Sequence, residues 1–310
     1  LSCVDLLVVW NLISLIYFSF CIVILCLIGR FSIFYLHHDP YYFKFFSLYY
    51  ILQIALVLLV LTQSSESVFI GWELLGLSSV LLISFYEHNK DTLKNSLRVL
   101  AIYKLSDIIF YTSLIFSAAQ GVTNYSLIEN QGVIFGIMVA CFIKSSLFPW
   151  TWLVNAMEGP TPSSALFYGG LATHTPIFIC LSLLNDKNLL ALNNAYLFLI
   201  YLMIITGIII STTLSRQCNN AKNALAYASI SQIGIIYLEI VMGFHLIALF
   251  HCIAHAAYRI FALLRTPSLL YQKHETEQNI KTLQEKKKWP PRLDRVNRYC
   301  YKFIYSNTML

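Results

Sequence analysis

The chain has 310 residues, of which 58% are hydrophobic and only 12% are charged. A soluble domain typically carries about 25% charged residues, and no single core can hide this much apolar surface from water. Together with a mean hydropathy of +0.66, this composition excludes an ordinary soluble domain and indicates a protein whose solvent is the membrane. The formal net charge of +6 comes largely from the C-terminal tail, and we do not expect nucleic-acid binding.

Nine apolar runs are long enough to cross about 30 Å of hydrocarbon. In chain order they cover residues 5–29, 45–63, 67–86, 97–119, 132–150, 160–184, 191–214, 224–242 and 246–264. We therefore predict an all-α membrane protein with about nine transmembrane helices. Because proline removes a backbone donor, we expect broken helices near Pro149 and Pro160-Pro162. Residues 1–264 form the predicted transmembrane domain, and 265–310 form a short basic tail.

The charged residues between these runs segregate if all nine cross the membrane. One side holds Asp5, Glu66, Glu129 and Asp186, with Lys187 as its only cation; the other holds the basic tail with Arg30, Lys44, Lys90, Lys94, Arg98, Arg216 and Lys222. The positive-inside rule then predicts an N-terminus outside and a cytoplasmic or matrix tail. We expect a multi-pass protein of the cell inner membrane, or of the mitochondrial inner membrane if the protein is organellar. Leu1 in place of Met suggests a fragment or an unusual start codon.

The eight cysteines lie mostly in apolar stretches and form no C-x-x-C pair. Isolated membrane cysteines usually serve as small hydrophobic residues. The sequence also lacks iron–sulfur cluster spacing and a dinucleotide fingerprint. We therefore expect no disulfide, no metal site, no cofactor, and no redox or hydrolytic centre on this chain.

A glutamate and a lysine lie deep within apolar runs. Glu73 is about a third of the way into its expected helix, and Lys144 precedes Pro149 by five residues. Burying an ionised side chain in hydrocarbon is costly unless it is paired or neutralised. An ion pair that only fixes helix packing, or a lysine that snorkels to the interface, would be structural explanations. We expect instead a switchable Glu73–Lys144 pair, because a desolvated lysine beside freed carbonyls can exchange its proton.

The run before His174 combines a tight helix entry with polar groups inside the next span. Glu158 stands before Gly159-Pro160 and suits the positive end of a helix dipole, so we assign it a structural capping role. Tyr168 and His174 follow inside the span, about a turn and a half apart. A membrane-embedded histidine can relay protons near neutral pH.

The final span carries His251, His255 and Arg259 at i, i+4 and i+8, which places all three on one helix face. A zinc site needs more ligands than two histidines of one helix, and no H-E-x-x-H pattern is present. We interpret this face as a proton wire, with ordinary interhelical hydrogen bonds as the alternative. Lys104 and Asp107 lie one turn apart and are expected to form a local pair.

Several of these residues stand in longer sequence blocks. The blocks are Gly71–Ser79, Lys144–Trp150, Ala156–Ala165, Leu225–Gly234 and Leu249–Arg259. In their order and content they resemble the antiporter-like family, over roughly residues 29–265. This family includes chain 5 of NADH:quinone oxidoreductase (the NuoL type), Mrp-type antiporter subunits and the DabB subunit of inorganic-carbon transporters.

The resemblance implies roles for individual residues. Glu73 matches the acidic member of the family's ion pair, and Lys144 matches its central lysine in a broken helix. Lys104 stands where a basic residue modulates that pair, while His251 and His255 match the histidines that connect the input half-channel onward. The family also has a second broken helix with its own lysine, so we expect the output half-channel to lie outside this sequence.

Two departures from the chain 5 pattern lean toward the DabB-like branch. Tyr168 stands where the complex I pattern has a histidine, with His174 displaced further along the same helix. The segment from Ala257 to Leu270 differs from the lysine and small-residue ending usual in chain 5.

Four functions follow as hypotheses. The first is a cation-conducting subunit that couples an ion gradient to inorganic-carbon uptake by a soluble zinc partner. The alternative is a proton-pumping chain 5 subunit of NADH:quinone oxidoreductase, which would make the chain a translocase subunit. An Mrp-type Na⁺/H⁺ antiporter subunit and a scaffold subunit that has lost transport are further candidates. The expected partners are membrane lipid, a soluble or peripheral subunit on the cytoplasmic side, and other membrane subunits that complete the ion path.

Overall fold

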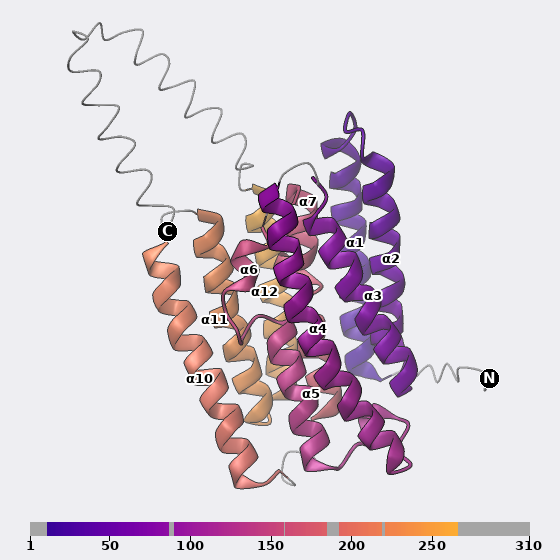
Figure 1. Ribbon diagram of the computed structural model, residues 1–310, viewed down its shortest axis with the longest axis vertical. Helices are drawn as coiled ribbons and strands as arrows, with labels where there is room; N and C mark the ends of the chain where they lie inside the picture. Colours follow the sequence, from indigo (N-terminus) through magenta and orange to yellow (C-terminus); the bar gives the residue numbers. More distant parts are fainter. Residues whose placement is uncertain (1–10, 87–89, 158, 185–191, 219–220, 266–310) are drawn as a thin grey trace, which may run out of the picture. The chain divides into compact units, whose positions relative to one another are not determined.

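The computed structural model describes residues 11–86, 90–157, 159–184, 192–218 and 221–265, with the backbone alone described at 155, 168 and 221. Within these ranges every regular element is helical, apart from one isolated bridge between Ser64 and Asn124. The helices, drawn in Figure 1, are α1 (Leu12–Tyr35), α2 (Tyr42–Leu61), α3 (Ser65–Ile83), α4 (Lys90–Ala119), η1 (Tyr125–Leu127), α5 (Gln131–Lys144), α6 (Trp152–Asn155), α7 (Thr161–Ser164), η2 (Ala165–Gly170), α8 (Thr175–Leu183), α10 (Asn194–Gln217), α11 (Ala221–Val241) and α12 (His245–Arg265).

Seven of the described helices are long and apolar enough to cross a membrane: α1, α2, α3, α4, α10, α11 and α12. The predicted all-α membrane class is confirmed. The count of nine spans stays a prediction, because α5 has only 14 residues and the segment predicted as one span over 160–184 is divided among α7, η2 and α8. The predicted tail, from 266 onward, lies outside the described residues.

The first predicted break occurs in α5, which ends at Lys144, well before Pro149. Leu147 N–H donates to the Phe142 carbonyl over 2.9 Å, and Ser146 N–H donates to the Ile143 carbonyl over 3.1 Å. These two bonds form a Schellman motif, in which the residue after the cap adopts a left-handed conformation. Ser146 takes that position with φ 66°. The helix is thus ended by its own capping turn, and Pro149 lies beyond it.

The second break lies between α7 and α8. Pro162 stands in the first turn of α7, where a missing N–H is tolerated. The chain continues as the π-helix η2 and reaches α8 through a turn that includes Thr173 and His174. η2 packs against α12 so closely that a Cβ on Gly169 would lie 3.0 Å from the backbone Cα of Ile260. Glycine therefore permits the contact that holds this irregular segment in place.

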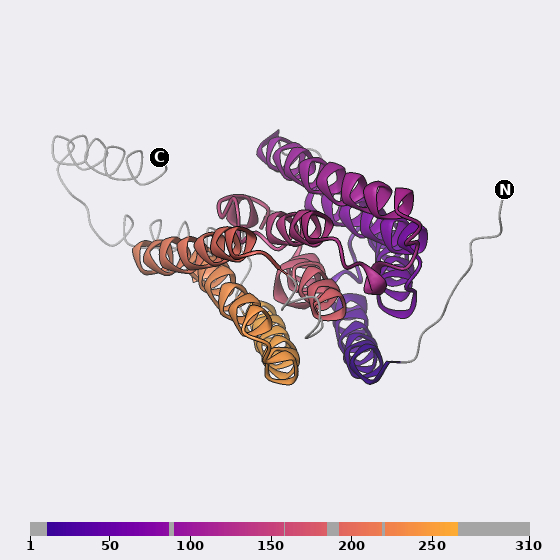
Figure 2. The ribbon, with the colours of Figure 1, turned by 90° about the horizontal axis from the view of Figure 1, so that it is seen from below.

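The broken segment occupies the interior of the bundle. Seen along the helices in Figure 2, α5 to α8 lie between α1–α4 on one side and α10–α12 on the other. Nearly every described side chain from 160 to 183 is buried. Irregular backbone at membrane depth is tolerated where other protein surrounds it. The helices that carry the predicted site residues, α3, α4, α5, α8 and α12, all pack around or belong to this region.

Candidate proton-transfer site

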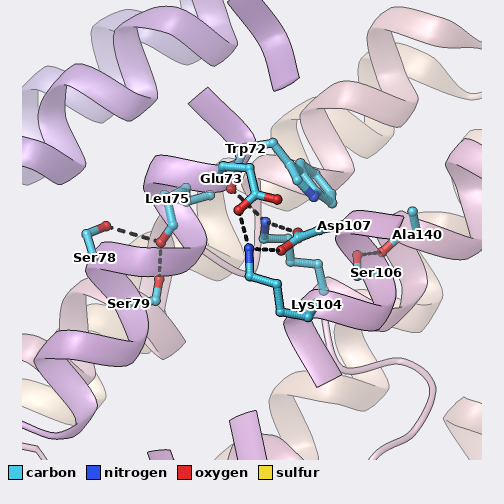
Figure 3. A network of polar contacts seen from close by, with 10 residues as sticks. Trp72, Glu73, Leu75, Ser78, Ser79, Lys104, Ser106, Asp107 and Ala140 are labelled. Atoms are coloured by element: carbon cyan, nitrogen blue, oxygen red, sulfur yellow. Dashed lines mark hydrogen bonds and ion pairs between the residues drawn. The ribbon is translucent and has the colours of Figure 1, made fainter. Parts of the chain in front are cut away.

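Four charged side chains from three helices meet inside the bundle. Glu73 comes from α3, and Lys104 and Asp107 come from α4 (Figure 3). Lys144 comes from the end of α5. Ser106 Oγ donates to the Ala140 carbonyl over 2.8 Å, which ties α4 to α5 beside the charged residues. We call Glu73, Lys104, Asp107 and Lys144 the charged network.

Lys144 lies at the sealed end of this network, with 1% of its side chain exposed. Its Nζ donates to the Trp72 carbonyl over 2.7 Å and to Asp107 Oδ1 over 3.1 Å. The same ammonium lies 4.0 Å from the centre of the Trp72 ring and 5.4 Å from that of Tyr103. Aromatic faces attract a desolvated cation. Lys144 is thus held by one carboxylate, one carbonyl and two rings, without contact to bulk water.

Asp107 joins the two lysines. Its Oδ1 accepts from Lys144, and its Oδ2 lies 3.4 Å from Lys104 Nζ. Lys104 Nζ in turn donates to Glu73 Oε2. The order of the network is therefore Glu73, Lys104, Asp107, Lys144, with alternating charge. The local pair of Lys104 and Asp107 that we expected from the sequence is present. The direct Glu73–Lys144 pair is not: the structure places Asp107 between the two lysines instead.

The first two residues of the network are partly exposed and the last two are buried. The exposed fraction is 52% for the Lys104 side chain and 31% for that of Glu73, but only 5% for that of Asp107. One end can therefore reach the surroundings of the bundle, while the end at Lys144 is closed. Asp107 contacts both the exposed Lys104 and the buried Lys144, so it connects the two ends of the network.

A second cluster lies where the turn before α8 meets α12. His174 Nε2 and His255 Nδ1 are 2.9 Å apart, and both rings are buried. His174 Nδ1 lies 3.2 Å from Thr173 Oγ1, and Arg259 Nε donates to His255 Nε2 over 3.1 Å. The predicted histidine face of α12 is thus joined to His174 of the broken segment. We call Thr173, His174, His255 and Arg259 the histidine cluster.

His251 takes a partner that the sequence analysis passed over. Its Nδ1 lies 2.9 Å from Glu239 Oε1, a carboxylate two residues before the end of α11. Its ring centre is 6.4 Å from that of His255, one turn further along α12. The sequence signal for this pair is the carboxylate of Glu239 inside an apolar run. A short loop follows it and brings the end of α11 next to the first turns of α12.

The residues that we predicted to take part in proton transfer therefore divide into two clusters. No hydrogen bond or ion pair joins the charged network to the histidine cluster among their described side chains. Of the other site predictions, the side chain of Tyr168 and the whole of Glu158 lie outside the described residues. Across the part of the chain that the structure describes, no group of three or more His, Cys, Asp or Glu side chains is arranged to hold a metal ion.

A helical membrane bundle with two acids, two lysines and a broken helix at its centre has the features of an ion-conducting membrane protein. A family model described as "NADH:quinone oxidoreductase/Mrp antiporter, TM" matches residues 62–290 of this chain. The chain belongs to that family, as the sequence blocks predicted.

Relatives of known name agree with this assignment. The chain is 31% identical to NADH-ubiquinone oxidoreductase chain 5 of Yarrowia lipolytica over 265 residues, which cover 81% of this chain and 40% of the relative. It is 29% identical to the chain 5 of Wickerhamomyces canadensis over 256 residues, covering 79% and 39%. It is 27% identical to NADH-quinone oxidoreductase subunit L of Campylobacter jejuni, covering 78% and 42%. The chain thus spans about two fifths of the length of these relatives.

Two solved structures share the fold. The Mrp complex from Dietzia sp. DQ12-45-1b superposes with a TM-score of 0.63 at 24% identity, over 73% of this chain and 26% of that chain. The archaeal respiratory complex named membrane-bound sulfane sulfur reductase superposes with a TM-score of 0.68 at 17% identity, over 79% and 54%. At these identities the likeness establishes the architecture alone.

Proposed function

We propose that this chain is a proton-translocating, antiporter-like membrane subunit of the NADH:quinone oxidoreductase chain 5 type. The observation that carries the proposal is the charged network, in which two acids and two lysines alternate from a partly exposed end to a sealed one. The relatives named as chain 5 or subunit L support the assignment of this chain to an NADH:quinone oxidoreductase. Because the chain spans only part of their length, the activity, partners and complex are proposals here.

The relatives favour the second of the functions predicted from the sequence over the first. They support a chain 5 subunit, and they give no support to inorganic-carbon uptake with a zinc partner. The DabB-like branch, suggested by Tyr168 and by the end of the last span, stays a sequence prediction. The Mrp complex resembles the chain in fold, which does not by itself favour Na⁺ over H⁺ as the transported ion.

The network suggests how a proton is moved. Asp107 faces Lys104 with one oxygen and Lys144 with the other. When Glu73 holds Lys104, Asp107 is free to hold the Lys144 ammonium. When Lys104 is released from Glu73 and moves onto Asp107, Lys144 loses its neutralising carboxylate. A buried ammonium without a partner is costly, so Lys144 then gives up its proton to the path beyond it.

A purely structural network is the competing explanation. Buried ion networks also fix helix packing, and removing one partner is destabilising whether or not the group carries protons. The two explanations differ in what happens when the network is changed and the subunit still assembles. A transport role requires that coupled proton movement is lost in that state, whereas a packing role requires that it is kept.

The test introduces Glu73→Gln and Lys144→Ala separately into the subunit within its assembled membrane complex. We expect normal assembly and loss of NADH-driven proton uptake into vesicles, followed with a pH-sensitive dye. Lys94→Gln is the control, because this exposed lysine also lies on α4 but outside the network. If both test variants pump protons at the control rate, the proposal is wrong.

The same preparation addresses the partners. As a chain 5 subunit, the protein should co-purify with other membrane subunits and with flavin- and iron–sulfur-containing subunits, in a mitochondrial or bacterial inner membrane. Co-purification with a large soluble zinc protein would instead restore the inorganic-carbon hypothesis. Identifying the bound subunits by mass spectrometry separates these outcomes.

A further inference from the structure

Arg259 makes the contact that determines where protons sit in the histidine cluster. A guanidinium group has hydrogen-bond donors only and keeps its charge in proteins. Because Arg259 Nε donates to His255 Nε2 over 3.1 Å, that nitrogen must offer a lone pair. A ring with a free lone pair is neutral and carries its single proton on the other nitrogen. His255 is therefore neutral, with its proton on Nδ1.

The same reasoning fixes the next group. His255 Nδ1–H faces His174 Nε2 at 2.9 Å, so His174 Nε2 accepts and its proton resides on Nδ1. That Nδ1–H points to Thr173 Oγ1 at 3.2 Å. The Thr173 hydroxyl in turn donates to the Phe167 carbonyl over 3.4 Å. All hydrogen bonds from Arg259 to Phe167 thus run in one direction, and the arginine sets that direction.

The series of hydrogen bonds that begins at Arg259 ends at the backbone carbonyl of Phe167. This residue lies in η2, and its carbonyl accepts from the Thr173 N–H over 3.3 Å as well as from the Thr173 hydroxyl. A Cβ on Gly169 would lie 3.1 Å from the backbone nitrogen of Ile260, the residue that follows Arg259. The close approach of η2 to α12 therefore holds His174 at hydrogen-bond distance from His255.

We propose that Arg259 is a positioning residue that sets the proton positions of a two-histidine relay, His255–His174, and that the relay accepts a proton only after Arg259 leaves His255 Nε2. The inference rests on the proton-translocating function proposed above. With Arg259 in place, neither ring has an unoccupied lone pair, since each accepting nitrogen already receives a hydrogen bond. The arginine therefore closes the relay as well as orienting it.

The proton movement balances once Arg259 withdraws. A proton adds to His255 Nε2, the His255 Nδ1 proton passes to His174 Nε2, and the His174 Nδ1 proton is released to a water or hydroxyl on the Thr173 side. Both rings end neutral, with their protons on the opposite nitrogens, and one proton has crossed. Return of Arg259 requires a lone pair on His255 Nε2, so before it returns each ring must lose its Nε2 proton and take up one proton at Nδ1, which leaves both rings neutral.

His251 lies one helical turn before His255 on α12 and is not part of the relay. The His251 ring centre lies 6.4 Å from that of His255, beyond direct hydrogen bonding, and Glu239 holds its Nδ1 at 2.9 Å. This places a second proton-bearing pair one helical turn from the nitrogen that Arg259 covers.

The test records ring-¹⁵N spectra of the full chain in lipid nanodiscs, with histidine labelled. His174→Asn and His255→Asn assign the two signals. In the wild type we expect two neutral rings, each with its proton on Nδ1. In Arg259→Met, which removes the donor but keeps an unbranched side chain, we expect the single Nδ1–H form of His255 to be lost. A mixture of tautomers or a protonated ring replaces it under conditions in which the wild-type ring stays neutral.

Arg265→Met is the matched control, because Arg265 lies on the same helix, is exposed and packs over the Phe261 ring rather than on a histidine. It should leave both signals unchanged. A wild-type His255 with its proton on Nε2 overturns the proposal, and so does an Arg259→Met spectrum identical to the wild type. The wild-type spectrum alone decides the tautomers if Arg259→Met fails to fold. These spectra require no transport, so they fail or succeed independently of the test of Glu73 and Lys144.

Discussion

Asp107 links the exposed lysine of the charged network to the buried one. It is almost completely buried, it contacts both lysines of the network, and its removal would leave Lys144 with the Trp72 carbonyl and two aromatic rings only. Glu73 lies at the more exposed end, where its carboxylate contacts Lys104 and not Lys144. The structure therefore ranks Asp107 above Glu73, although the glutamate is the more conspicuous residue in the sequence.

Replacing Asp107 by asparagine tests this ranking. Asp107→Asn keeps the shape but removes the charge that neutralises Lys144, so Lys144 should stay in its neutral form and proton transfer should stop. We expect a larger loss of NADH-driven proton uptake in vesicles than for Glu73→Gln, at equal assembly. Lys90→Gln, an exposed change in the first turn of α4, is the control. If Asp107→Asn keeps at least as much proton uptake as Glu73→Gln, Asp107 is not the central carboxylate.

Gly76 leaves the space that Lys144 occupies. A Cβ at this position would lie 3.3 Å from Lys144 Nζ and 3.4 Å from Tyr103 Cδ2. Gly76→Ala should therefore push the ammonium away from Asp107 and lower proton transport, with an overpacking cost of about 1–3 kcal/mol. Thermal unfolding and proton uptake are measured on the same preparation.

The control for this change is Gly132→Ala, at the start of α5, where the nearest atom to an added Cβ is Asn130 Oδ1 at 3.4 Å. Both changes add the same methyl group to a helix. Equal effects of the two substitutions on transport would mean that the space beside Lys144 is unimportant.

At the scale of single elements, the sequence predicted that the helices break but not how. Pro149 suggested a break, yet α5 ends earlier, at the Schellman motif around Ser146. A left-handed serine leaves no sequence signal, because glycine is the residue expected there. Similarly, the direct Glu73–Lys144 pair follows from the depth of the two residues in their apolar runs and from the family resemblance, neither of which locates Asp107. Only the relative rotation of α3, α4 and α5 decides which carboxylate faces Lys144, and apolar periodicity does not encode that rotation when lipid and protein faces are both hydrophobic.

The end of α5 offers a test of that capping turn. Ser146 holds a left-handed conformation that costs a non-glycine residue about 1–2 kcal/mol, and its buried hydroxyl has no hydrogen-bond partner among the described residues. Ser146→Gly should therefore raise the free energy of unfolding by about 1 kcal/mol, after the entropic cost of glycine is subtracted. The midpoint of thermal unfolding in detergent measures the change.

Ser145→Gly is the neighbouring control. Ser145 has φ −83° and donates its hydroxyl to the Cys141 carbonyl over 2.8 Å, so glycine gains nothing there and loses a hydrogen bond. We expect this variant to unfold at a lower temperature than the wild type. A Ser146→Gly protein that unfolds as early as Ser145→Gly would contradict the strain argument.

For the whole molecule, the all-helical membrane class and the family are the best-predicted features. Helix class and the positions of the long helices followed from hydrophobic runs, and the family followed from ordered blocks. α4 shows why the charge pattern is informative: its 30 residues extend about 45 Å, more than the roughly 30 Å of hydrocarbon. We therefore predict that its basic first turns, with Lys90, Lys94 and Arg98, extend into the headgroup region at one membrane surface.

This overhang makes the predicted orientation testable. The positive-inside rule places Lys94 on the cytoplasmic or matrix side, and Glu129, in the segment after the far end of α4, on the opposite side. Both side chains are exposed. Lys94→Cys and Glu129→Cys, each in a background without its accessible native cysteines, should react with a membrane-impermeant maleimide from opposite sides of sealed vesicles. If the maleimide reaches Glu129→Cys from the cytoplasmic or matrix side and Lys94→Cys from the opposite side, the topology is the reverse of the predicted one. If it labels both variants from one side, α4 does not cross the membrane.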